Sequence, residues 1–341
     1  MQLLRQTPLV SVVMSVRNDA RFVAESIDSI LRQTAPDFEF IIFDDGSIDS
    51  SRQVISSFTD ARIKMFGLGG VGLASALNQG LGMARGTYVA RQDADDISAP
   101  ERFEQQIAYL ESNPEIDVLG TAVTAIDQEG RRLRDYEYPL TDAEIRQELC
   151  RMHNPLVHGS LMYRKQRILD IHGYRPAFRK SEDYDMHLRA ARYLKFANLE
   201  KRLLQYRVRL DSMSGGRDEE ALQYSLLARA LAAIRNAGME DSDEMLPDFE
   251  RALRGWSARQ GIERVALSGF SRRSAVISWY GGRRFRALRE LGASLWADPL
   301  WPIRERVFHA DAYWTPRIED DIVALFRSTV EKRCHSNPAC R

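Results

Sequence analysis

Three aspartates within four residues form the strongest chemical signal in the sequence. They are Asp93, Asp95 and Asp96, in the run Gln92–Asp96 that follows a short apolar segment typical of a strand. Because residues two apart in an extended chain point the same way, Asp93 and Asp95 can face one ligand. Carboxylates this close repel one another unless a cation or hydrogen-bond donors offset their charge. Hard divalent ions take oxygen ligands and share them with substrate phosphates, so the run predicts a Mg²⁺ or Mn²⁺ site on a phosphate-bearing substrate.

Two of the acidic signals also have a plain structural interpretation. Asp96 or Ser98 before Pro100 can cap the next helix, although capping accounts for one acid and not three. The tetrad Asp44–Ser47 follows another strand-like segment and can form a turn and cap for a helix at 50–58. Its functional interpretation is a carboxylate that accepts hydrogen bonds from a bound base or ribose.

A third acidic pair, Glu182 and Asp183, opens a predicted helix over Ser181–Tyr193. Acids in a first turn suit the helix dipole, and Ser181 is a plausible cap. A carboxylate there is instead a general base if the fold brings it near the metal.

A glycine-rich loop gives the competing hypothesis. Gly67–Gly72 matches G-x-G-x-x-G between a short strand and a helix, and Asp93 follows at the distance of a ribose-binding acid. This pattern alone predicts a dinucleotide-binding oxidoreductase. Against it, the strand before the loop is the third in the chain, and three acids would repel a pyrophosphate.

The other reactive side chains give weaker signals. His158, in a predicted strand over Val157–Tyr163, is the one histidine we retain as a site candidate. Cys334, His335 and Cys340 are a possible soft-metal trio, but they lie in a polar tail, for which disorder is the preferred interpretation.

The segments around these acids alternate between the two-residue hydrophobic period of strands and the 3.6-residue period of helices. Predicted strands cover Leu9–Val16, Phe38–Phe43, Ile63–Phe66, Thr87–Ala90 and Val118–Ile126, with amphipathic helices between them. Repeated β-α-β units predict a parallel sheet, whose ligands bind outside the carboxyl ends of the strands. Two of the acidic clusters, Asp44–Asp45 and Asp93–Asp96, fall at such ends.

Glu129–Gly130 predicts a hairpin turn. After Gly215–Gly216 the pattern is mostly helical, which divides the chain into residues 1–215 and 216–341.

Composition limits the possible classes. The 341 residues carry 48 basic and 48 acidic side chains, which argues against nucleic-acid binding through bulk positive charge. Three cysteines cannot form a disulfide framework, so a reducing compartment is expected. We find neither a signal peptide nor the roughly 18 apolar residues of a membrane span. These features predict a cytoplasmic protein.

One segment departs from the overall charge balance. Residues 251–289 carry ten arginines, a single acid and several aromatic residues. This composition suits either the anionic inner face of the cell membrane or a solvated helical face packed on the catalytic domain.

Read in order, the acidic runs and their flanking segments resemble family 2 glycosyltransferases. The matching segments are Pro8–Asn18, Ala24–Thr34, Phe43–Ser47, Gly72–Asn78, Ala84–Asp96, Ser181–Arg189 and Tyr206–Arg209. The resemblance covers about residues 8–215. It implies a GT-A fold, that is, a Rossmann-like α/β sheet flanked by helices, followed here by a mostly helical C-terminal region. It also implies a nucleotide-diphospho-sugar donor, with a UDP-sugar favoured, and inversion at the anomeric carbon.

The resemblance assigns roles by position. Asp45 would contact the nucleobase with Asp44 beside it, Asp93 would approach the ribose, and Asp95 would hold Mn²⁺ or Mg²⁺ on the diphosphate. Asp183 would deprotonate the acceptor hydroxyl, assisted by Glu182.

Departures from the family pattern add further candidates. Arg17, where the family often has Tyr, is expected on the nucleotide side with Asn18. Gly70 takes the place of a common Asn. Arg209 stands where a His is common, and we place it with His158 on the acceptor or diphosphate side.

The sequence therefore predicts a metal-dependent inverting glycosyltransferase that builds a surface glycan. Its acceptor would be a glycan or a lipid-linked glycan. The absence of a Q-x-x-R-W motif argues against a processive synthase. The oxidoreductase and a non-catalytic nucleotide-sugar binding module remain as alternatives.

Overall fold

The computed structural model describes residues 7–209, 219–260 and 316–336, together with positions 285, 288, 289 and 291. The chain forms two compact units. The first contains Met1–Glu148 and Asn154–Arg207, and the second contains Leu149–His153 and Val208–Arg341. The boundary expected at Gly215–Gly216 lies outside the described residues.

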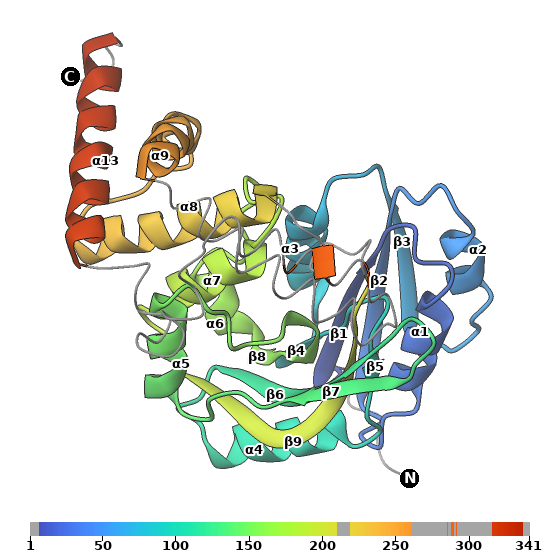
Figure 1. The fold of residues 1–341 in the computed structure, drawn as a ribbon. Coiled ribbons are helices and arrows are strands. Elements are labelled where there is room, and N and C mark those ends of the chain that lie inside the picture. The colour runs from blue at the N-terminus through green and yellow to red at the C-terminus, as the bar shows by residue number, and fades with distance from the viewer. Residues whose placement is uncertain are drawn as a thin grey trace. The chain divides into compact units, whose positions relative to one another are not determined.

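The first unit is built on a nine-stranded mixed sheet in the order β3-β2-β1-β4-β8-β6-β9-β5, with β7 paired to β6 (Figure 1). The strands are β1 (Val10–Val16), β2 (Phe38–Asp45), β3 (Ile63–Leu68), β4 (Tyr88–Arg91), β5 (Ile97–Ser98), β6 (Val118–Ile126), β7 (Arg132–Tyr136), β8 (Met162–Arg164) and β9 (Phe196–Arg207). Strands β1 to β4 are mutually parallel where they pair. The prediction of a parallel sheet is confirmed for this half of the sheet.

The other half mixes both strand directions. Strand β8 runs antiparallel to β4 and β6, whereas β9 runs parallel to β6. The strand predicted over Val157–Tyr163 is wrong in its first part, because residues His158–Ser160 form a short 3₁₀ helix, η1. The hairpin predicted at Glu129–Gly130 is confirmed: it joins β6 to β7, and Gly130 has a φ of 80°.

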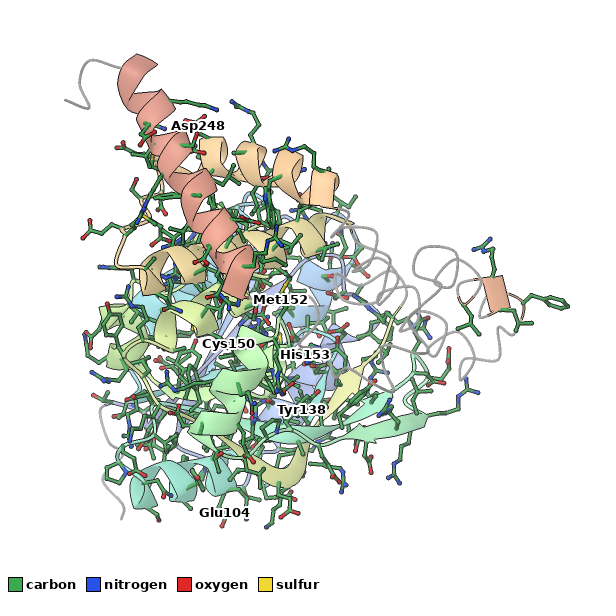
Figure 2. All side chains as sticks on the ribbon, turned by 60° about the vertical axis from the view of Figure 1, so that its left-hand side comes forward. Glu104, Tyr138, Cys150, Met152, His153 and Asp248 are labelled. Carbon is green, nitrogen blue, oxygen red and sulfur yellow. The ribbon has the colours of Figure 1, made fainter. Side chains whose placement is uncertain are left out.

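Helices of the first unit cover the sheet. They are α1 (Val23–Leu31), α2 (Ser51–Ser56), α3 (Leu73–Met83), α4 (Arg102–Ser112), α5 (Asp142–Cys150), α6 (Lys165–Asp170) and α7 (Glu182–Ala190). Cys150, at the end of α5, is exposed and its thiol is free (Figure 2). Helix α7 confirms most of the helix predicted over Ser181–Tyr193.

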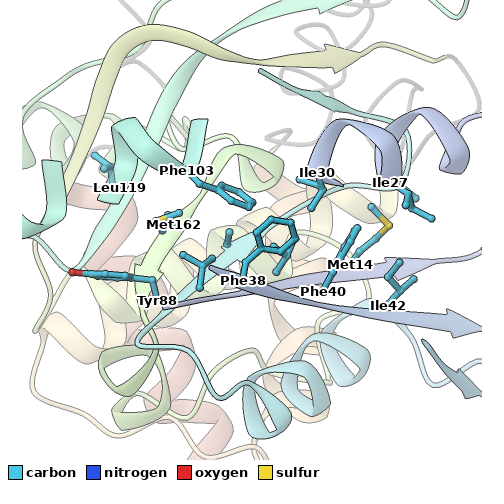
Figure 3. Packing of buried hydrophobic residues seen from close by; sticks show 14 of the residues in the cluster. Met14, Ile27, Ile30, Phe38, Phe40, Ile42, Tyr88, Phe103, Leu119 and Met162 are labelled. Carbon is cyan, nitrogen blue, oxygen red and sulfur yellow. The ribbon is translucent and has the colours of Figure 1, made fainter. Parts of the chain in front are cut away.

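The hydrophobic core holds the carboxyl ends of the strands in a fixed register. Phe40 and Met14 from neighbouring strands are fully buried beside Ile27 of α1 (Figure 3). Phe38 and Phe103 pack edge to face at 5.7 Å between ring centres, an arrangement that favours aromatic pairs. Burial of each such side chain contributes about 1.5–3 kcal/mol, so the strand ends that carry the acids are firmly positioned.

The second unit contains the helices α8 (Glu219–Asn236), α9 (Leu246–Gln260) and α13 (Pro316–Ser336). Phe249 and Phe326 pack edge to face at 5.1 Å. Trp256, part of the arginine-rich segment, is buried, whereas the rest of that segment after residue 260 lies almost entirely outside the described residues. No helix in the described ranges is both long and apolar enough to cross a bilayer.

Candidate active site

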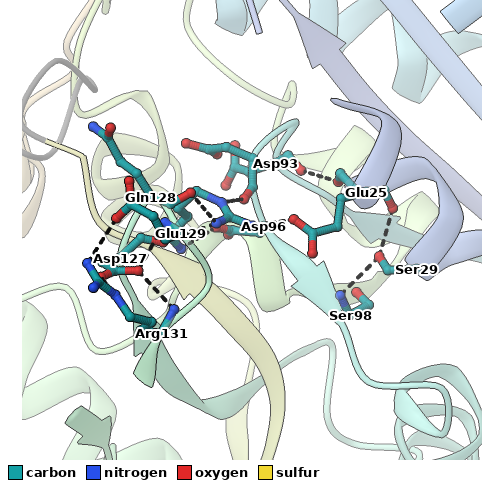
Figure 4. A network of polar contacts seen from close by, with 12 residues as sticks. Glu25, Ser29, Asp93, Asp96, Ser98, Asp127, Gln128, Glu129 and Arg131 are labelled. Carbon is teal, nitrogen blue, oxygen red and sulfur yellow. Dashed lines mark hydrogen bonds and ion pairs between the residues drawn. The ribbon is translucent and has the colours of Figure 1, made fainter. Parts of the chain in front are cut away.

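The acidic run after β4 forms a compact cluster. Asp93 pairs with Arg91 at 2.6 Å, and Asp96 is completely buried. One oxygen of Asp96, Oδ1, accepts the backbone N–H of Arg207 at 2.8 Å, whereas Oδ2 has no hydrogen-bond partner (Figure 4). Burial raises the pKa of Asp96 well above its usual value, and the charges of Asp95 and Asp93 add to the effect. The cluster therefore holds more negative charge than its protein partners offset.

Gly159 of η1 closes the cluster on one side. A Cβ atom at this position would lie 2.7 Å from Asp96 Oδ2 and 2.8 Å from Asp93 Oδ2. Both distances are too short for any side chain, so the glycine is required by the close approach of two carboxylates. Two acids separated by two positions in sequence thus point oxygens at one small region.

The helix-capping interpretation of Asp96 and Ser98 is wrong. Helix α4 begins at Arg102 after Glu101 and has no side-chain cap. Ser98 instead donates to Gln92 Oε1 at 2.8 Å, inside a buried network that orients the acidic loop.

Arg207, at the end of β9, hydrogen-bonds to this loop, to the β6–β7 hairpin and to α1. Its guanidinium donates to the carbonyl oxygens of Asp95 and Asp127 and to the Glu25 carboxylate, at 2.8, 3.0 and 2.6 Å. The side chain is buried over the ring of Phe22. Sequence reasoning selected Arg209 from this motif and missed Arg207. Arg209 falls in the second unit, and its role stays a prediction.

The acids after β2 bind their own backbone surroundings. Asp45 accepts the N–H groups of Val71 and Gly72, one at each oxygen, at 2.7 and 2.9 Å. Asp44 accepts the N–H of Ser47 at 3.1 Å. Both carboxylates are buried. Asp45 therefore holds the glycine loop in place. Each of its oxygens keeps a lone pair that can accept a hydrogen bond from a nucleobase.

Arg17 and Asn18 lie at the same corner of the sheet. Asn18 has a φ of 58° and accepts the N–H of Ile48 at 2.9 Å through its side-chain oxygen. The exposed Arg17 lies beside Gly70, whose Cβ position would be 3.7 Å from the guanidinium. The predicted nucleotide-side residues after β1 and β2 are thus brought together around the glycine loop.

This geometry does not support the dinucleotide alternative. The amides of Val71 and Gly72, which a pyrophosphate would need, are bound by Asp45. The loop also follows β3, which is the edge strand of the sheet rather than a central one.

The fold brings the acids of α7 to the cluster after β4. Ser181 makes no side-chain capping bond, so its predicted role as a cap is wrong. Burial raises the pKa of Glu182 to about 8, with the Asp183 charge adding to it. Burial also raises the pKa of Asp183 to about 6, and the charge of Asp93 adds to that shift. Both shifts have the same direction, because desolvation and neighbouring acids disfavour the charged form of each carboxyl group.

Arg91 is the main counter-charge, and sequence reasoning missed it. It is 1% exposed, pairs with Asp93, and its positive charge lowers the pKa values of Glu182 and Asp183 against the effect of burial. Arg91 stands two positions before the first of the three acids, and no local pattern in the sequence marks it.

His158 lies beside this group as a neutral side chain. Its Nε2 is 2.9 Å from the Tyr174 hydroxyl, and its Nδ1 is 4.0 Å from Glu182 Oε1. Burial lowers the pKa of His158 well below its usual value, and the charge of Arg91 lowers it further. His158 can accept or donate a hydrogen bond here, but it contributes no charge toward a diphosphate.

The acidic cluster fits a hard divalent cation. The unpartnered Oδ2 of buried Asp96 and the nearby Oδ2 of Asp93 are oxygen ligands of the kind that Mg²⁺ and Mn²⁺ prefer. In the part of the chain that the structure describes, no three Asp, Glu, His or Cys side chains form a complete metal site. Such ions usually bind one or two carboxylates together with substrate phosphates.

The fold defines a class, the GT-A glycosyltransferases, and comparison with known proteins gives the family. Residues 11–173 match the model of glycosyl transferase family 2. The O-antigen biosynthesis glycosyltransferase WbnJ of Escherichia coli is 34% identical over 60% of this chain and 82% of its own length. The putative glycosyltransferase EpsE of Bacillus subtilis is 36% identical over 60% and 74%. The chain belongs to glycosyltransferase family 2.

Solved structures support the fold. TarS residues 1–349 of S. aureus, in complex with UDP-GlcNAc, has a TM-score of 0.57 and 18% identity over 96% of this chain and 92% of that one. The mannosyltransferase PcManGT of Pyrobaculum calidifontis, in complex with GDP-Man and Mn²⁺, has a TM-score of 0.52 and 18% identity over 96% and 87%. The predicted GT-A fold and glycosyltransferase activity are confirmed.

Proposed function

We propose that this glycosyltransferase transfers a sugar from a nucleotide-diphospho-sugar to an acceptor hydroxyl with inversion and with the help of a divalent metal. One observation carries the proposal. The acidic cluster after β4 and the acidic pair of α7 are close enough for Asp93 to raise the pKa values of both Glu182 and Asp183. The acids proposed to act on the diphosphate and the acid proposed as the base would thus share one site.

Inversion needs a single in-line displacement and therefore one base opposite the leaving group. Asp183 accepts the proton of the acceptor hydroxyl, and the acceptor oxygen forms its bond to the anomeric carbon. The bond from that carbon to the diphosphate oxygen breaks, and its electron pair leaves with the nucleoside diphosphate. Asp95 would hold the metal, which when bound offsets the charge that develops on the diphosphate, and Asp93 would approach the ribose.

Asp44, Asp45, Arg17 and Asn18 would form the nucleotide side of the site. We favour UDP as the nucleotide, in line with TarS, although the mannosyltransferase binds GDP-Man. Relatives named for O-antigen and amylovoran biosynthesis favour a surface glycan, free or lipid-linked, as the acceptor. His158 and Arg209 are proposed on the acceptor or diphosphate side.

A thermal-shift panel of UDP-, GDP- and dTDP-sugars, each with Mn²⁺, Mg²⁺ or EDTA, tests the donor and the metal together. The expected result is a rise in Tm with one nucleotide class that is lost with EDTA and in Asp95→Ala. Anomeric configuration of the product, read by NMR with the selected donor, then tests inversion. Retention of configuration, or a metal-independent shift that persists in Asp95→Ala, would contradict the proposal.

A further inference from the structure

The loop before η1 places an amide side chain directly on the proposed base. Asn154 donates from Nδ2 to Asp183 Oδ2 at 2.8 Å. The other oxygen of Asp183, Oδ1, accepts the backbone N–H of Tyr184 at 2.7 Å. One donor on each oxygen fixes the rotation of the carboxylate. It also favours the charged form, because hydrogen bonds to a carboxylate lower its pKa.

His187 contacts the other end of the Asn154 amide. Its Nδ1 lies 2.9 Å from Asn154 Oδ1. Burial lowers the pKa of His187 to about 3, and the charge of Arg189 lowers it further, so the ring is neutral at working pH. A neutral ring can pair with the amide oxygen only by donating its Nδ1 proton. The buried Nε2 has no hydrogen-bond partner, as suits the nitrogen that carries no proton.

The Asn154 side chain therefore has one satisfied orientation. With its oxygen facing His187, its NH₂ group must face Asp183. The main chain of the loop is held separately, by Asn198, whose Nδ2 donates to Pro155 O at 3.2 Å and to Pro139 O at 2.8 Å. The bonds from Asn198 thus hold the loop, and the Asn154–Asp183 hydrogen bond is not needed for that purpose.

We propose that Asn154 is a positioning residue for the transferase base: held by His187, it orients Asp183 and keeps it ionised. This inference rests on the proposed function, since it gives Asp183 the role of base. The other charged groups that face Asp183 are Glu182, Asp93 and Arg91. The charge of Asp93 opposes ionisation of Asp183, whereas that of Arg91 favours it. A hydrogen-bond donor at Asn154 therefore acts in the same direction as Arg91.

The test compares Asn154→Ala and Asn154→Asp with the wild type and with Asn198→Ala. Asn154→Asp keeps the shape of the side chain but replaces the donor with a second carboxylate. A space-filling role predicts that it is tolerated, whereas the proposed role predicts that it is at least as harmful as Asn154→Ala. Asn198→Ala loosens the same loop without touching Asp183.

The first readout is the titration midpoint of Asp183 itself. In protein labelled with ¹³C at aspartate carboxyl carbons, the Asp183 signal is assigned by its loss in Asp183→Asn. Asn154→Ala is expected to raise the midpoint by about 0.5–1 pH unit, and Asn154→Asp by more. Asn198→Ala is expected to lower Tm and leave the midpoint unchanged.

The second readout is release of UDP from UDP-GlcNAc, or of GDP from GDP-Man, with Mg²⁺ at pH 7. Asn154→Ala is expected to lower kcat about tenfold with an unchanged KM for the donor. An unchanged midpoint and rate in both Asn154 variants would overturn the inference while leaving the proposed function intact. The opposite outcome is also possible. If the Asn154 variants raise the midpoint but the wild type turns over neither donor, the positioning role is supported and the proposed function is not.

Discussion

At the scale of single residues, the site depends on the separate protonation states of two adjacent acids. Glu182 is buried and Asp183 is half-buried. Desolvation raises the pKa of Asp183 to about 6 and that of Glu182 to about 8. Groups whose environments separate their pKa values in this way are candidates for acid and base roles. An ionised Asp183 can accept a proton at neutral pH, whereas a protonated Glu182 cannot.

Asp183→Asn should keep nucleotide binding and lose transfer. The amide has the same shape but cannot accept the proton, so kcat is expected to fall by about 10²–10⁴-fold. Titration calorimetry with UDP and Mn²⁺ should give an unchanged Kd. In the wild type, kcat should fall below about pH 6, because protonated Asp183 is inactive as a base. Transfer by Asp183→Asn at near the wild-type rate would mean that another group is the base.

Gly159→Ala should disrupt the metal-binding cluster. The added methyl group would lie within 2.8 Å of carboxylate oxygens of both Asp96 and Asp93, so at least one of them must move. We expect the Mn²⁺-dependent thermal shift with nucleotide to be lost. Gly82→Ala is the matched control, since a methyl group there meets nothing within 4 Å. Equal Mn²⁺ responses in the two variants would show that the cluster does not hold the ion.

At the scale of secondary-structure elements, the active loop is positioned by strands that are distant in sequence. The loop after β4, which carries Asp93 and Asp96, lies near Asp127 of the β6–β7 hairpin (Figure 4). One buried side chain at the end of β9, Arg207, donates to backbone carbonyl groups of both segments. Loops are mobile unless their backbone groups are bound, so this arginine gives the loop a defined shape before any ligand binds.

Arg207→Met should loosen the loop without removing any of its acids. Methionine keeps most of the apolar contact with Phe22. It leaves the half-buried carbonyl groups of Asp95, Asp127 and Gln128 without this donor, each at a cost of up to about 1–3 kcal/mol. We expect a lower Tm and roughly tenfold weaker Mn²⁺-dependent UDP binding. Arg202→Met is the control on the same strand, because Arg202 pairs at the surface with Asp135 and Glu137. If Arg207→Met lowers Tm but leaves UDP affinity intact, the loop does not need this anchor.

The pattern of elements was largely predictable, but the partners across the sheet were not. Strand Val118–Ile126 was predicted with its observed bounds, because a continuous apolar run is a local property. By contrast, η1 replaced part of a predicted strand, and the capping roles of Asp96 and Ser181 were wrong. For Asp96, a long-range contact with Arg207 took the carboxylate that a local rule had assigned to a helix cap.

At the scale of the whole molecule, burial of Glu182 in the site lowers the free energy of unfolding. Between about pH 4.5 and 8, the folded protein keeps a proton on Glu182 that the unfolded chain has lost. Folding therefore takes up a proton, and stability from this group falls as pH rises through that window.

Glu182→Gln should stabilise the ligand-free protein at pH 7.5, because the amide mimics the protonated acid and removes the need for proton uptake. The expected gain is on the order of 1–3 kcal/mol, or a few degrees in Tm. Near pH 4.5 the difference should disappear, since both states then keep the proton. Glu111→Gln, exposed on α4, is expected to change Tm equally little at both pH values. A Glu182→Gln variant that is no more stable at pH 7.5 than at pH 4.5 would contradict the burial argument.

The sequence by itself determined the class of this protein. Acids at strand ends, the order of short motifs and the β-α-β periodicity are local properties, and together they predicted a family 2 glycosyltransferase with its candidate metal ligands and base. Only the tertiary structure decided which groups share the site. Asp93 and Asp183 are about ninety residues apart, and Arg91 and Asn154 carry no local pattern that marks them. Their proximity follows from the packing of α7 and the η1 loop beside β4, and electrostatic and hydrogen-bonding effects depend on distance in space rather than in sequence.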